Sequence, residues 1–233
     1  MWYTTIFEIK DSIALAGNPE LKELHKKIRS HLDDQKNEWN KPFYPRYQGY
    51  GRIKLSGLRD TERRMDNYGL AKHLKHGWRL LDIGCNTGFM SLESARLVRH
   101  VDAFDVNPYL VKIGQEVKDF LKQDNVSFSS CGFEDFEVKE KYDAIFSFAN
   151  HHTLDGLTTF SINDYFTKAS DSLNPGGLLF FESHEYGTEN WDEVDKVLDR
   201  FFIRMEEKDL RKENALMHHR ILRILKKKDP GPS

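Results

Sequence analysis

The residues whose types and spacing suggest chemistry gather around one short stretch, residues 79–92. An apolar run there reaches Asp82, Gly84 and Gly88 follow, and an apolar pattern of helical spacing then begins. This order predicts a strand, a tight turn and a helix. Gly84 lets the backbone turn without a side chain in the way, and Gly88 lets a ligand and the new helix approach closely. Because amides at a helix start attract electron-rich groups, we expect a small-molecule site here.

The spacing of the glycines narrows the class of ligand. A dinucleotide-binding loop favours G-x-G-x-x-G, whereas Asp82 to Gly88 gives D-x-G-x-x-x-G, with Asn86 in place of the middle glycine. The stretch also lacks the phosphate-binding lysine of a P-loop. A nicotinamide-dependent dehydrogenase is therefore disfavoured, and a plain structural turn in another α/β protein remains the alternative.

Asp105 is the second polar landmark. It ends the next expected strand, Val101–Asp105, 21 residues after Gly84 (105 minus 84). A carboxylate at that place can accept hydrogen bonds from both hydroxyls of a ribose, which predicts nucleoside binding. Asn107 adds a polar group beside it, although capping the helix that starts at Pro108 explains this residue equally well.

Two adjacent histidines, His151 and His152, follow the expected strand Tyr142–Phe148. Imidazole titrates near neutral pH, so either histidine suits the role of general base, with a structural role as the equal alternative. A metal site that adds Glu182 and His184 is a weaker hypothesis, because no tight ligand spacing supports it. We therefore expect no metal.

The rest of the chain supplies the elements that position these residues. Strands are expected at Leu80–Gly84, Val101–Asp105, Val126–Cys131, Tyr142–Phe148, Leu178–Glu182, Phe202–Glu206 and His219–Leu225. Helices are expected at Glu20–Leu32, from Asp60 or Thr61 onward, and at Phe89–Val98, Asn107–Leu121, Ser161–Leu173 and Asn190–Phe201. The alternation predicts an α/β fold with a doubly wound, mostly parallel seven-stranded sheet, closed by an antiparallel pair.

The N-terminal part is expected to be an extension to that sheet. Residues 1–19 show little periodicity, and the loop Trp39–Arg52 mixes aromatic residues with cations. Such a loop either packs on the domain or closes over a ligand as a lid. We thus expect a helical extension and lid at residues 1–58, the catalytic domain at residues 59–228 and a tail at residues 229–233.

Composition excludes several classes of protein. The net charge of −2 gives no global basic field for nucleic acid. Neither a leader pattern nor an apolar stretch of membrane-spanning length is present, so no membrane segment is expected. The cysteines, Cys85 and Cys131, fall in expected core elements and not in a disulfide framework, so we expect a cytoplasmic protein.

The stretch around Gly84, with Asp105 and the closing strand pair, resembles the class I S-adenosylmethionine-dependent methyltransferases. That resemblance implies S-adenosylmethionine as the cofactor. Its amino-acid end would lie in the first loop, its ribose near Asp105, and its adenine beside Phe133 and Glu134. The loop after Phe148 would face the methyl group and the acceptor. The cofactor residues implied in these loops are Asp82, Gly84, Cys85, Asn86, Gly88, Asp105, Val106, Asn107, Phe133, Glu134 and Phe148.

A further segment, Asp60-Thr61-Glu62-x-Arg64-x-Asp66, is similar to one in the tRNA wobble-uridine carboxymethyltransferases, which use carboxy-S-adenosylmethionine. This resemblance implies that Arg63 and Tyr68 lie near the cofactor, and we assign Arg64 and Tyr68 to the cofactor site. The chain lacks the Lys-Gly-Pro context of that family, so ordinary S-adenosylmethionine is expected and the carboxy form is the less favoured alternative.

We therefore expect a methyltransferase that moves a methyl group to a small-molecule or glycan-linked acceptor by direct displacement. One alternative is an RNA-modifying (carboxy)methyltransferase, favoured by the Trp39–Arg52 loop and a lysine tail, Lys226–Lys228. Another is a non-catalytic module that binds S-adenosylmethionine. The oligomeric state stays open at this point.

Overall fold

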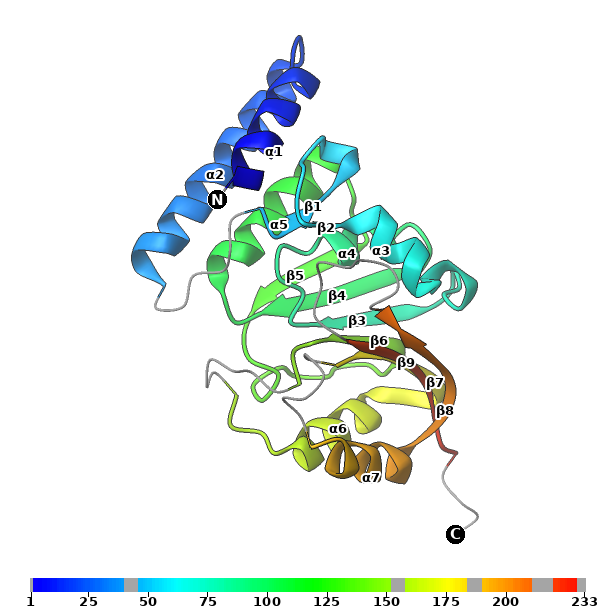
Figure 1. Cartoon of the computed structure of the whole chain (residues 1–233). Helices are drawn as coiled ribbons and strands as arrows, with labels where there is room; N and C mark the ends of the chain where they lie inside the picture. The colour runs from blue at the N-terminus through cyan, green and yellow to red at the C-terminus, as the bar shows by residue number, and fades with distance from the viewer. Residues whose placement is uncertain (1, 40–45, 152–157, 184–189, 211–219, 230–233) are drawn as a thin grey trace.

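A seven-stranded sheet organises the protein (Figure 1). The computed structural model describes residues 2–39, 46–151, 158–183, 190–210 and 220–229. The sheet order is β5-β4-β3-β6-β7-β9-β8, in which β9 runs antiparallel to both its neighbours and the other pairs are parallel. The strands are β3 (Arg79–Ile83), β4 (His100–Asp105), β5 (Val126–Ser130), β6 (Tyr142–Phe148), β7 (Leu173–Glu182), β8 (Phe202–Asp209) and β9 (Ile221–Lys227). The doubly wound, mostly parallel sheet with its antiparallel closing pair is confirmed.

Helices cover both faces of this sheet. In Figure 1, α6 and α7 lie on one face and α3, α4 and α5 on the other. The helices are α1 (Trp2–Ala14), α2 (Pro19–Glu38), α3 (Thr61–Tyr68), α4 (Phe89–Ser94), α5 (Pro108–Leu121), α6 (Ile162–Ser172) and α7 (Trp191–Phe201). Short 3-10 turns span η1 (Gly51–Ile53) and η2 (Leu70–Lys72), and a small second sheet pairs β1 (Gln48–Gly49) with β2 (Arg59–Asp60).

Polar caps fix where the central helices begin. The Asp60 carboxylate accepts a hydrogen bond from the Arg63 amide at 2.9 Å, which starts α3. Ser161 likewise caps α6 by accepting from the Asp164 amide at 3.1 Å. These side chains satisfy amides that have no partner within the helix, so the sequence sets these boundaries locally.

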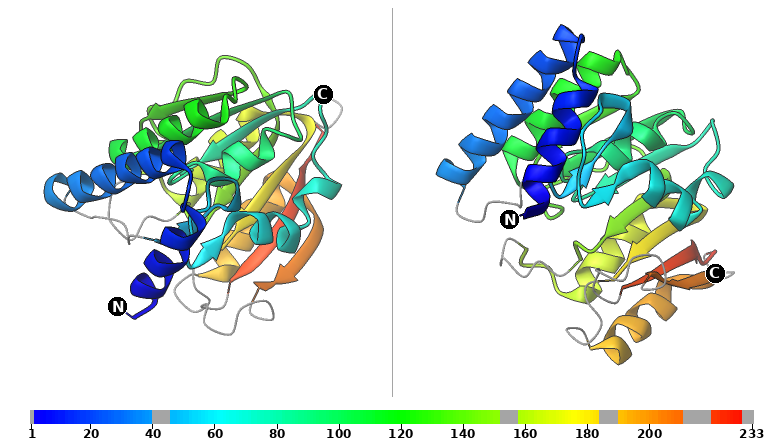
Figure 2. Two further views of the ribbon diagram at one scale, coloured as in Figure 1. Left: turned by 90° about the horizontal axis from the view of Figure 1, so that it is seen from above. Right: turned by 45° about the horizontal axis from the view of Figure 1, so that its top comes forward.

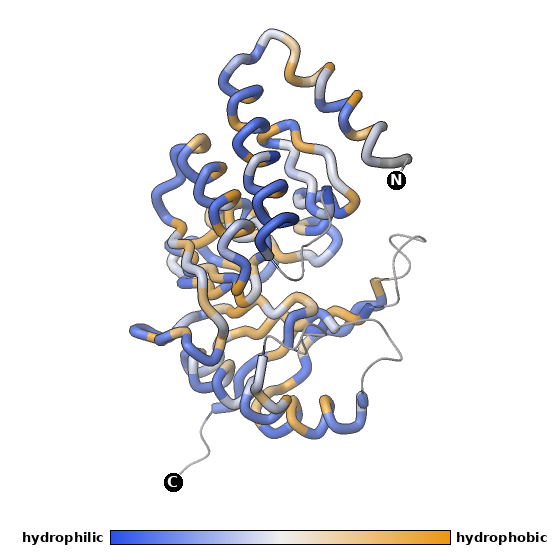
Figure 3. The backbone as a smooth tube through the Cα atoms, turned by 90° about the vertical axis from the view of Figure 1, so that its left-hand side faces the viewer, coloured by the Kyte–Doolittle hydropathy of each residue, from blue (hydrophilic) through white to orange (hydrophobic). Residues whose placement is uncertain are grey.

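Helix α1 corrects the expectation of little periodicity in residues 1–19. Ile6, Ile9 and Ile13 are spaced three and four residues apart and lie on one face, with 52%, 58% and 72% of their surface exposed. The helical signal was therefore present, but these apolar residues are not buried as the usual pattern assumes. Figure 3 shows apolar positions along this exposed helix.

Helix α2 is longer than expected and packs along α5, as both views of Figure 2 show. Its buried Leu21, Leu24 and Ile28 belong to the same hydrophobic cluster as Leu80 of the central strand. From the loop that follows, Tyr50 is fully buried and stacks on Phe89 at 5.4 Å between ring centroids. This part of the loop thus packs on the domain, and the domain boundary near residue 58 stays a prediction.

Strand β7 begins earlier than expected. Helix α6 ends at Ser172, and the stretch Asn174–Gly177, which lies between the expected helix and the expected strand, belongs to the strand. Pairing with β6 is irregular there, because the partner of Tyr142 is Leu173 whereas the partner of Ala144 is Leu178. The proline within Asn174–Gly177 has no backbone N–H to donate to a neighbouring strand, so it fits a section where the pairing is irregular.

Candidate active site

The order of the strands marks the carboxyl ends of β3 and β6, which we call the crevice, as the expected place of a ligand. From β3 the chain continues to β4 and β5 on one side of the sheet, and later to β6 and β7 on the other. Ligands of doubly wound sheets bind where the strand order reverses in this way. Gly84 follows β3 at this point, and Phe148 ends β6 beside Glu182, which ends β7.

The loop after β3 has the backbone conformation that its sequence predicts. Gly84, Asn86 and Gly88 all have positive φ, at +62°, +55° and +71°. The Cys85 amide donates to the Phe104 carbonyl at 2.9 Å, which ties the loop to β4. Cys85 is buried, and burial raises the pKa of its thiol, so this group is held as a neutral packing side chain.

The two glycines have different neighbours. A Cβ on Gly84 would lie 2.7 Å from the Asn150 side-chain nitrogen, at the crevice itself. A Cβ on Gly88 would lie 2.3 Å from the ring of Phe128 on β5. The small size of Gly88 therefore admits the ring of Phe128 and brings helix α4 and strand β5 together, and its close approach to a ligand stays a prediction.

Asp105 braces this loop from the end of β4. Its Oδ2 accepts a hydrogen bond from the Asn86 amide at 2.8 Å, and its Oδ1 accepts from the Asn107 amide at 2.9 Å. Each carboxylate oxygen has two lone pairs, so each can accept more than one donor at a time. Val106 lies between these contacts and is half-buried.

Asn107 is used as a structural link. Its Oδ1 caps α5 by accepting from the Tyr109 amide at 3.0 Å, and its Nδ2 donates to Gln35 of α2 at 2.7 Å. Only 4% of the residue is exposed. Its polar atoms are thus committed to α5 and α2, so we leave Asn107 out of the proposed cofactor contacts.

The loop after β5 packs more deeply than the sequence suggested. Phe133 is 5% exposed and meets Tyr165 edge to face at 5.1 Å, so its ring belongs to the core beneath the sheet. The Glu134 Oε1 atom accepts from the amides of Thr159 at 2.7 Å and Phe160 at 3.2 Å. Burial raises the pKa of Glu134, but hydrogen bonds from the Thr158 hydroxyl and from backbone amides outweigh it and lower the pKa overall.

The structure describes only the first residue of the histidine pair. His151 is 1% exposed and packs among aromatic rings, with Phe181 at 4.7 Å and Phe166 at 6.0 Å between centroids. A ring this deeply buried is poorly placed to take a proton from an acceptor in the crevice. His152 lies outside the described residues, so its role as a general base stays a prediction.

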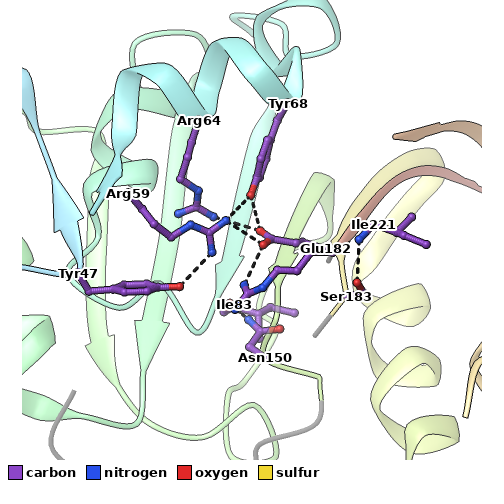
Figure 4. A network of polar contacts seen from close by, with 10 residues as sticks. Tyr47, Arg59, Arg64, Tyr68, Ile83, Asn150, Glu182, Ser183 and Ile221 are labelled. Carbon is purple, nitrogen blue, oxygen red and sulfur yellow. Dashed lines mark hydrogen bonds and ion pairs between the residues drawn. The ribbon is translucent and has the colours of Figure 1, made fainter. Parts of the chain in front are cut away.

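A buried carboxylate, Glu182, collects the strongest polar contacts near the crevice (Figure 4). Its Oε1 accepts from Arg59 and Arg220, both at 2.9 Å. Its Oε2 accepts from the Tyr68 hydroxyl at 2.6 Å and from Arg64 at 3.2 Å. Arg64 and Tyr68, which the sequence assigned to the cofactor, are therefore bound to Glu182.

Electrostatics keep this carboxylate ionised although none of it is exposed. Burial raises the pKa of Glu182, but three guanidinium groups and the Tyr68 hydroxyl outweigh that effect and hold it well below its usual range. Burial and the nearby carboxylate raise the pKa of Tyr68 to about 12, so this phenol is neutral at physiological pH. Within the described part of the chain, no three His, Cys, Asp or Glu side chains are grouped to hold a metal ion.

Sequence reasoning missed Arg59 and Arg220 as functional candidates. Arg59 lies 123 residues before Glu182 and Arg220 lies 38 residues after it. No local spacing signals such contacts, because only the folded chain brings β2 of the small sheet and the residue before β9 beside the end of β7. The weaker hypothesis of a metal ligand at Glu182 has no support here, because both of its oxygens accept hydrogen bonds from arginines.

Asp82 lies beneath the crevice in β3. It is 2% exposed and accepts a hydrogen bond from the Ser91 hydroxyl. Burial is the main cause that raises its pKa from 3.8 to about 7, against the opposing effects of Ser91 and Arg64. The ionised carboxylate is thus disfavoured in the folded protein, and Asp82 changes protonation near neutral pH.

We expect Asp82→Asn to stabilise the protein increasingly as pH rises from 5 to 7. The unfolded chain releases the Asp82 proton near pH 4, whereas the folded protein keeps it until about pH 7. The free energy of unfolding of the wild type therefore falls by about 1.4 kcal/mol for each pH unit of increase in this window. The variant lacks the titrating group and does not show this decrease. Urea unfolding at pH 5, 6, 7 and 8 measures this difference, which levels off above pH 7. Equal slopes for both proteins would show that Asp82 is not the titrating group.

Comparison with known proteins decides the family. Residues 74–229 match the family model described as a methyltransferase domain. This chain belongs to that methyltransferase family. The match starts just before β3 and spans the sheet to the end of β9, so it contains the loop after β3 and the ends of β6 and β7. The methyltransferase uses S-adenosylmethionine as its cofactor, as the first loop implied.

Individual relatives agree with this assignment. A 77-residue stretch is 36% identical to ribosomal protein L11 methyltransferase of Acetivibrio thermocellus, and it covers 33% of this chain and 24% of that protein. The match thus spans about a quarter of the length of this curated relative. No described helix of the methyltransferase is both long and apolar enough to cross a bilayer.

Solved structures share the fold. The N-methyltransferase NodS of Bradyrhizobium japonicum, in complex with S-adenosylhomocysteine, superposes with a TM-score of 0.57. It is 16% identical over 88% of this chain and 98% of that chain. An rRNA methylase from Streptococcus thermophilus gives a TM-score of 0.56 and 20% identity over 75% of this chain and 100% of that chain. The class I fold is confirmed, and the closer resemblance to wobble-uridine carboxymethyltransferases stays a prediction.

Proposed function

We propose that this methyltransferase acts on a small-molecule or glycan-linked acceptor, which it places in the crevice between β3 and β6. The observation that carries this proposal is the loop from Gly84 to Gly88, held by Asp105 at the edge of that crevice. When bound, the cofactor would supply a methyl group that its sulfonium activates for direct displacement, with the electron pair of the carbon–sulfur bond left on sulfur.

The residues present fit such a cofactor. Asp105 places two carboxylate oxygens at the strand end, where a ribose would need an acceptor. Phe148 is half-buried beside the crevice and offers an apolar wall on the acceptor side. The residues that we propose to hold the cofactor are Asp82, Gly84, Cys85, Asn86, Gly88, Asp105, Val106, Glu134 and Phe148.

The protein's own task is to align the acceptor and to remove its proton where it has one. A hydroxyl acceptor needs a base, and we keep His152 for that role. An acceptor that is already an anion needs positioning only. RNA is the less favoured acceptor, because the net charge of −2 lacks the basic field that many phosphates require.

Replacing Asp105 with asparagine tests the cofactor site. We expect the affinity for S-adenosylhomocysteine, measured by calorimetric titration, to fall roughly 10- to 100-fold, because hydrogen bonds to a charged acceptor contribute about 1.5–3 kcal/mol. Asp192→Asn, at an exposed position of α7, is the matched control and keeps the wild-type affinity. Unchanged affinity in Asp105→Asn would refute the placement of the ribose.

A further inference from the structure

The side chains around Glu182 carry more positive than negative charge. We call Arg59, Arg64 and Arg220 the arginine cluster. All three bind the single carboxylate of Glu182, while Tyr68 is neutral, so the group has a net charge of +2. Arg59 is only 6% exposed and Arg64 only 9%. Buried charge without a partner is costly, so the cluster calls for a further anion.

No other described side chain supplies that anion. Asp82 is the next acid that interacts with Arg64, but it forms no ion pair with the cluster and its pKa is about 7. The Tyr47 hydroxyl accepts from Arg59 at 3.0 Å. Burial raises the pKa of Tyr47, yet Arg59 and Arg220 outweigh burial and lower it. The positive charge of the cluster thus favours the ionised form of the Tyr47 phenol.

The arginines also have hydrogen-bond donors to spare. Among the residues that the structure describes, none accepts from the buried Nε atoms of Arg59, Arg64 and Arg220. Arg64 and Arg220 each reach Glu182 through one nitrogen. A guanidinium group offers paired donors that match a carboxylate or a phosphate in shape and charge. A purely structural cluster would not need to leave these donors without acceptors.

The cluster lies on the acceptor side of the crevice. Glu182 ends β7, two strands from β3, which corresponds to about 10 Å across the sheet. Arg64 stands over the ring of Phe148 at 5.6 Å, at the end of the strand between them. The loop and Asp105, which we assign to the cofactor, lie toward β4, in the opposite direction.

We infer that the arginine cluster binds an anionic group of the methyl acceptor, a carboxylate or a phosphate. This inference rests on the proposed function, because it takes the crevice as the place of methyl transfer. An acceptor anchored at β7 through its anion extends toward the end of β6, where the activated methyl group is expected. The acceptor is then an acidic small molecule or an acidic sugar conjugate.

A binding titration tests the cluster without an identified acceptor. Inorganic phosphate and succinate are added separately to protein saturated with S-adenosylhomocysteine, and NMR follows the arginine Nε–H signals. We expect saturable shifts of the Arg59 and Arg64 signals with at least one of these anions. Arg220→Gln weakens that binding about 10-fold or more, because one charged hydrogen-bond partner is lost. Arg200→Gln, an exposed arginine on α7, leaves it unchanged.

The same variants separate this inference from a role in cofactor binding. We expect Arg220→Gln to bind S-adenosylhomocysteine as the wild type does. A comparable loss of S-adenosylhomocysteine affinity would assign the cluster to the cofactor, and Nε–H signals that respond to neither anion would make it purely structural. Either result overturns the inference.

A methyl-transfer screen identifies the source of the anion. Labelled S-adenosylmethionine is incubated with the protein and metabolite fractions separated by anion exchange, and we expect label in the retained fractions. Loss of the acceptor on phosphatase treatment indicates a phosphate, and survival indicates a carboxylate. Label only in neutral fractions, or only in nuclease-sensitive material, would overturn the inference while methyl transfer stands. No label in any fraction would count against the proposed function, and the NMR titration then decides the cluster by itself.

Discussion

Replacing Glu182 with glutamine is expected to lower the free energy of unfolding by about 3–5 kcal/mol. Glutamine keeps the shape of the side chain but removes the charge that three arginines and Tyr68 surround. The variant buries the guanidinium groups without their counter-charge, and repulsion among them is no longer offset. Urea unfolding at pH 7 measures the loss.

Glu140→Gln is the matched control. Glu140 pairs with Arg79 at 2.9 Å but its side chain is 65% exposed, so its loss costs less than about 1 kcal/mol. The Glu182 effect also depends on pH. Because folding lowers the pKa of Glu182, its stabilisation is present above the unfolded value and is lost progressively as pH falls from about 4 toward the folded pKa, so wild type and variant approach each other in acid. A loss below about 1 kcal/mol at pH 7 would mean that another negative group compensates the arginines.

Gly88→Ala is expected to destabilise the protein by about 2–5 kcal/mol and to weaken binding of S-adenosylhomocysteine. Two costs combine in this substitution. A φ of +71° costs a residue with a side chain about 1–2 kcal/mol, and a Cβ 2.3 Å from the ring of Phe128 forces the core apart at about 1–3 kcal/mol. Thermal and urea unfolding measure the stability, and calorimetric titration measures the affinity.

Gly17→Ala isolates the conformational part of this effect. Gly17 has a φ of +79°, and no atom lies within 4 Å of the place that a Cβ would occupy, so only the backbone cost of about 1–2 kcal/mol applies. Trimming the ring by Phe128→Leu in the Gly88→Ala background is expected to recover part of the remainder. Equal losses of stability in Gly88→Ala and Gly17→Ala would mean that the ring of Phe128 moves aside at no cost in free energy.

Features encoded by neighbouring residues could be predicted from the sequence. The strand, turn and helix around Gly84 follow from one apolar run, two glycines and one helical pattern. Asp105 was found because a strand ends at a fixed distance from that turn. The caps at Asp60 and Ser161 act within three residues of themselves, so the starts of α3 and α6 were also accessible.

Features that depend on the tertiary fold could not be predicted in this way. The partners of Glu182 come from β2, α3 and the start of β9, and no periodicity connects them. His151 follows β6 at the expected place, but packing against Phe181 and Phe166 decides that it is buried. The Oε1 atom of Glu134 likewise accepts from the amides of residues 159 and 160, a contact that no spacing in the sequence signals.

The separation between Glu182 and its arginines has a consequence for synthesis of the chain. Arg59 and Arg64 precede their carboxylate by 123 and 118 residues. At about 5–20 residues per second, they leave the ribosome roughly 6–25 s before Glu182. The strands that carry Gly84 and Asp105 are complete in that interval, whereas the arginines have no counter-charge to bury against and stay hydrated. The acceptor half of the crevice is therefore expected to form later than the half that contains Gly84 and Asp105.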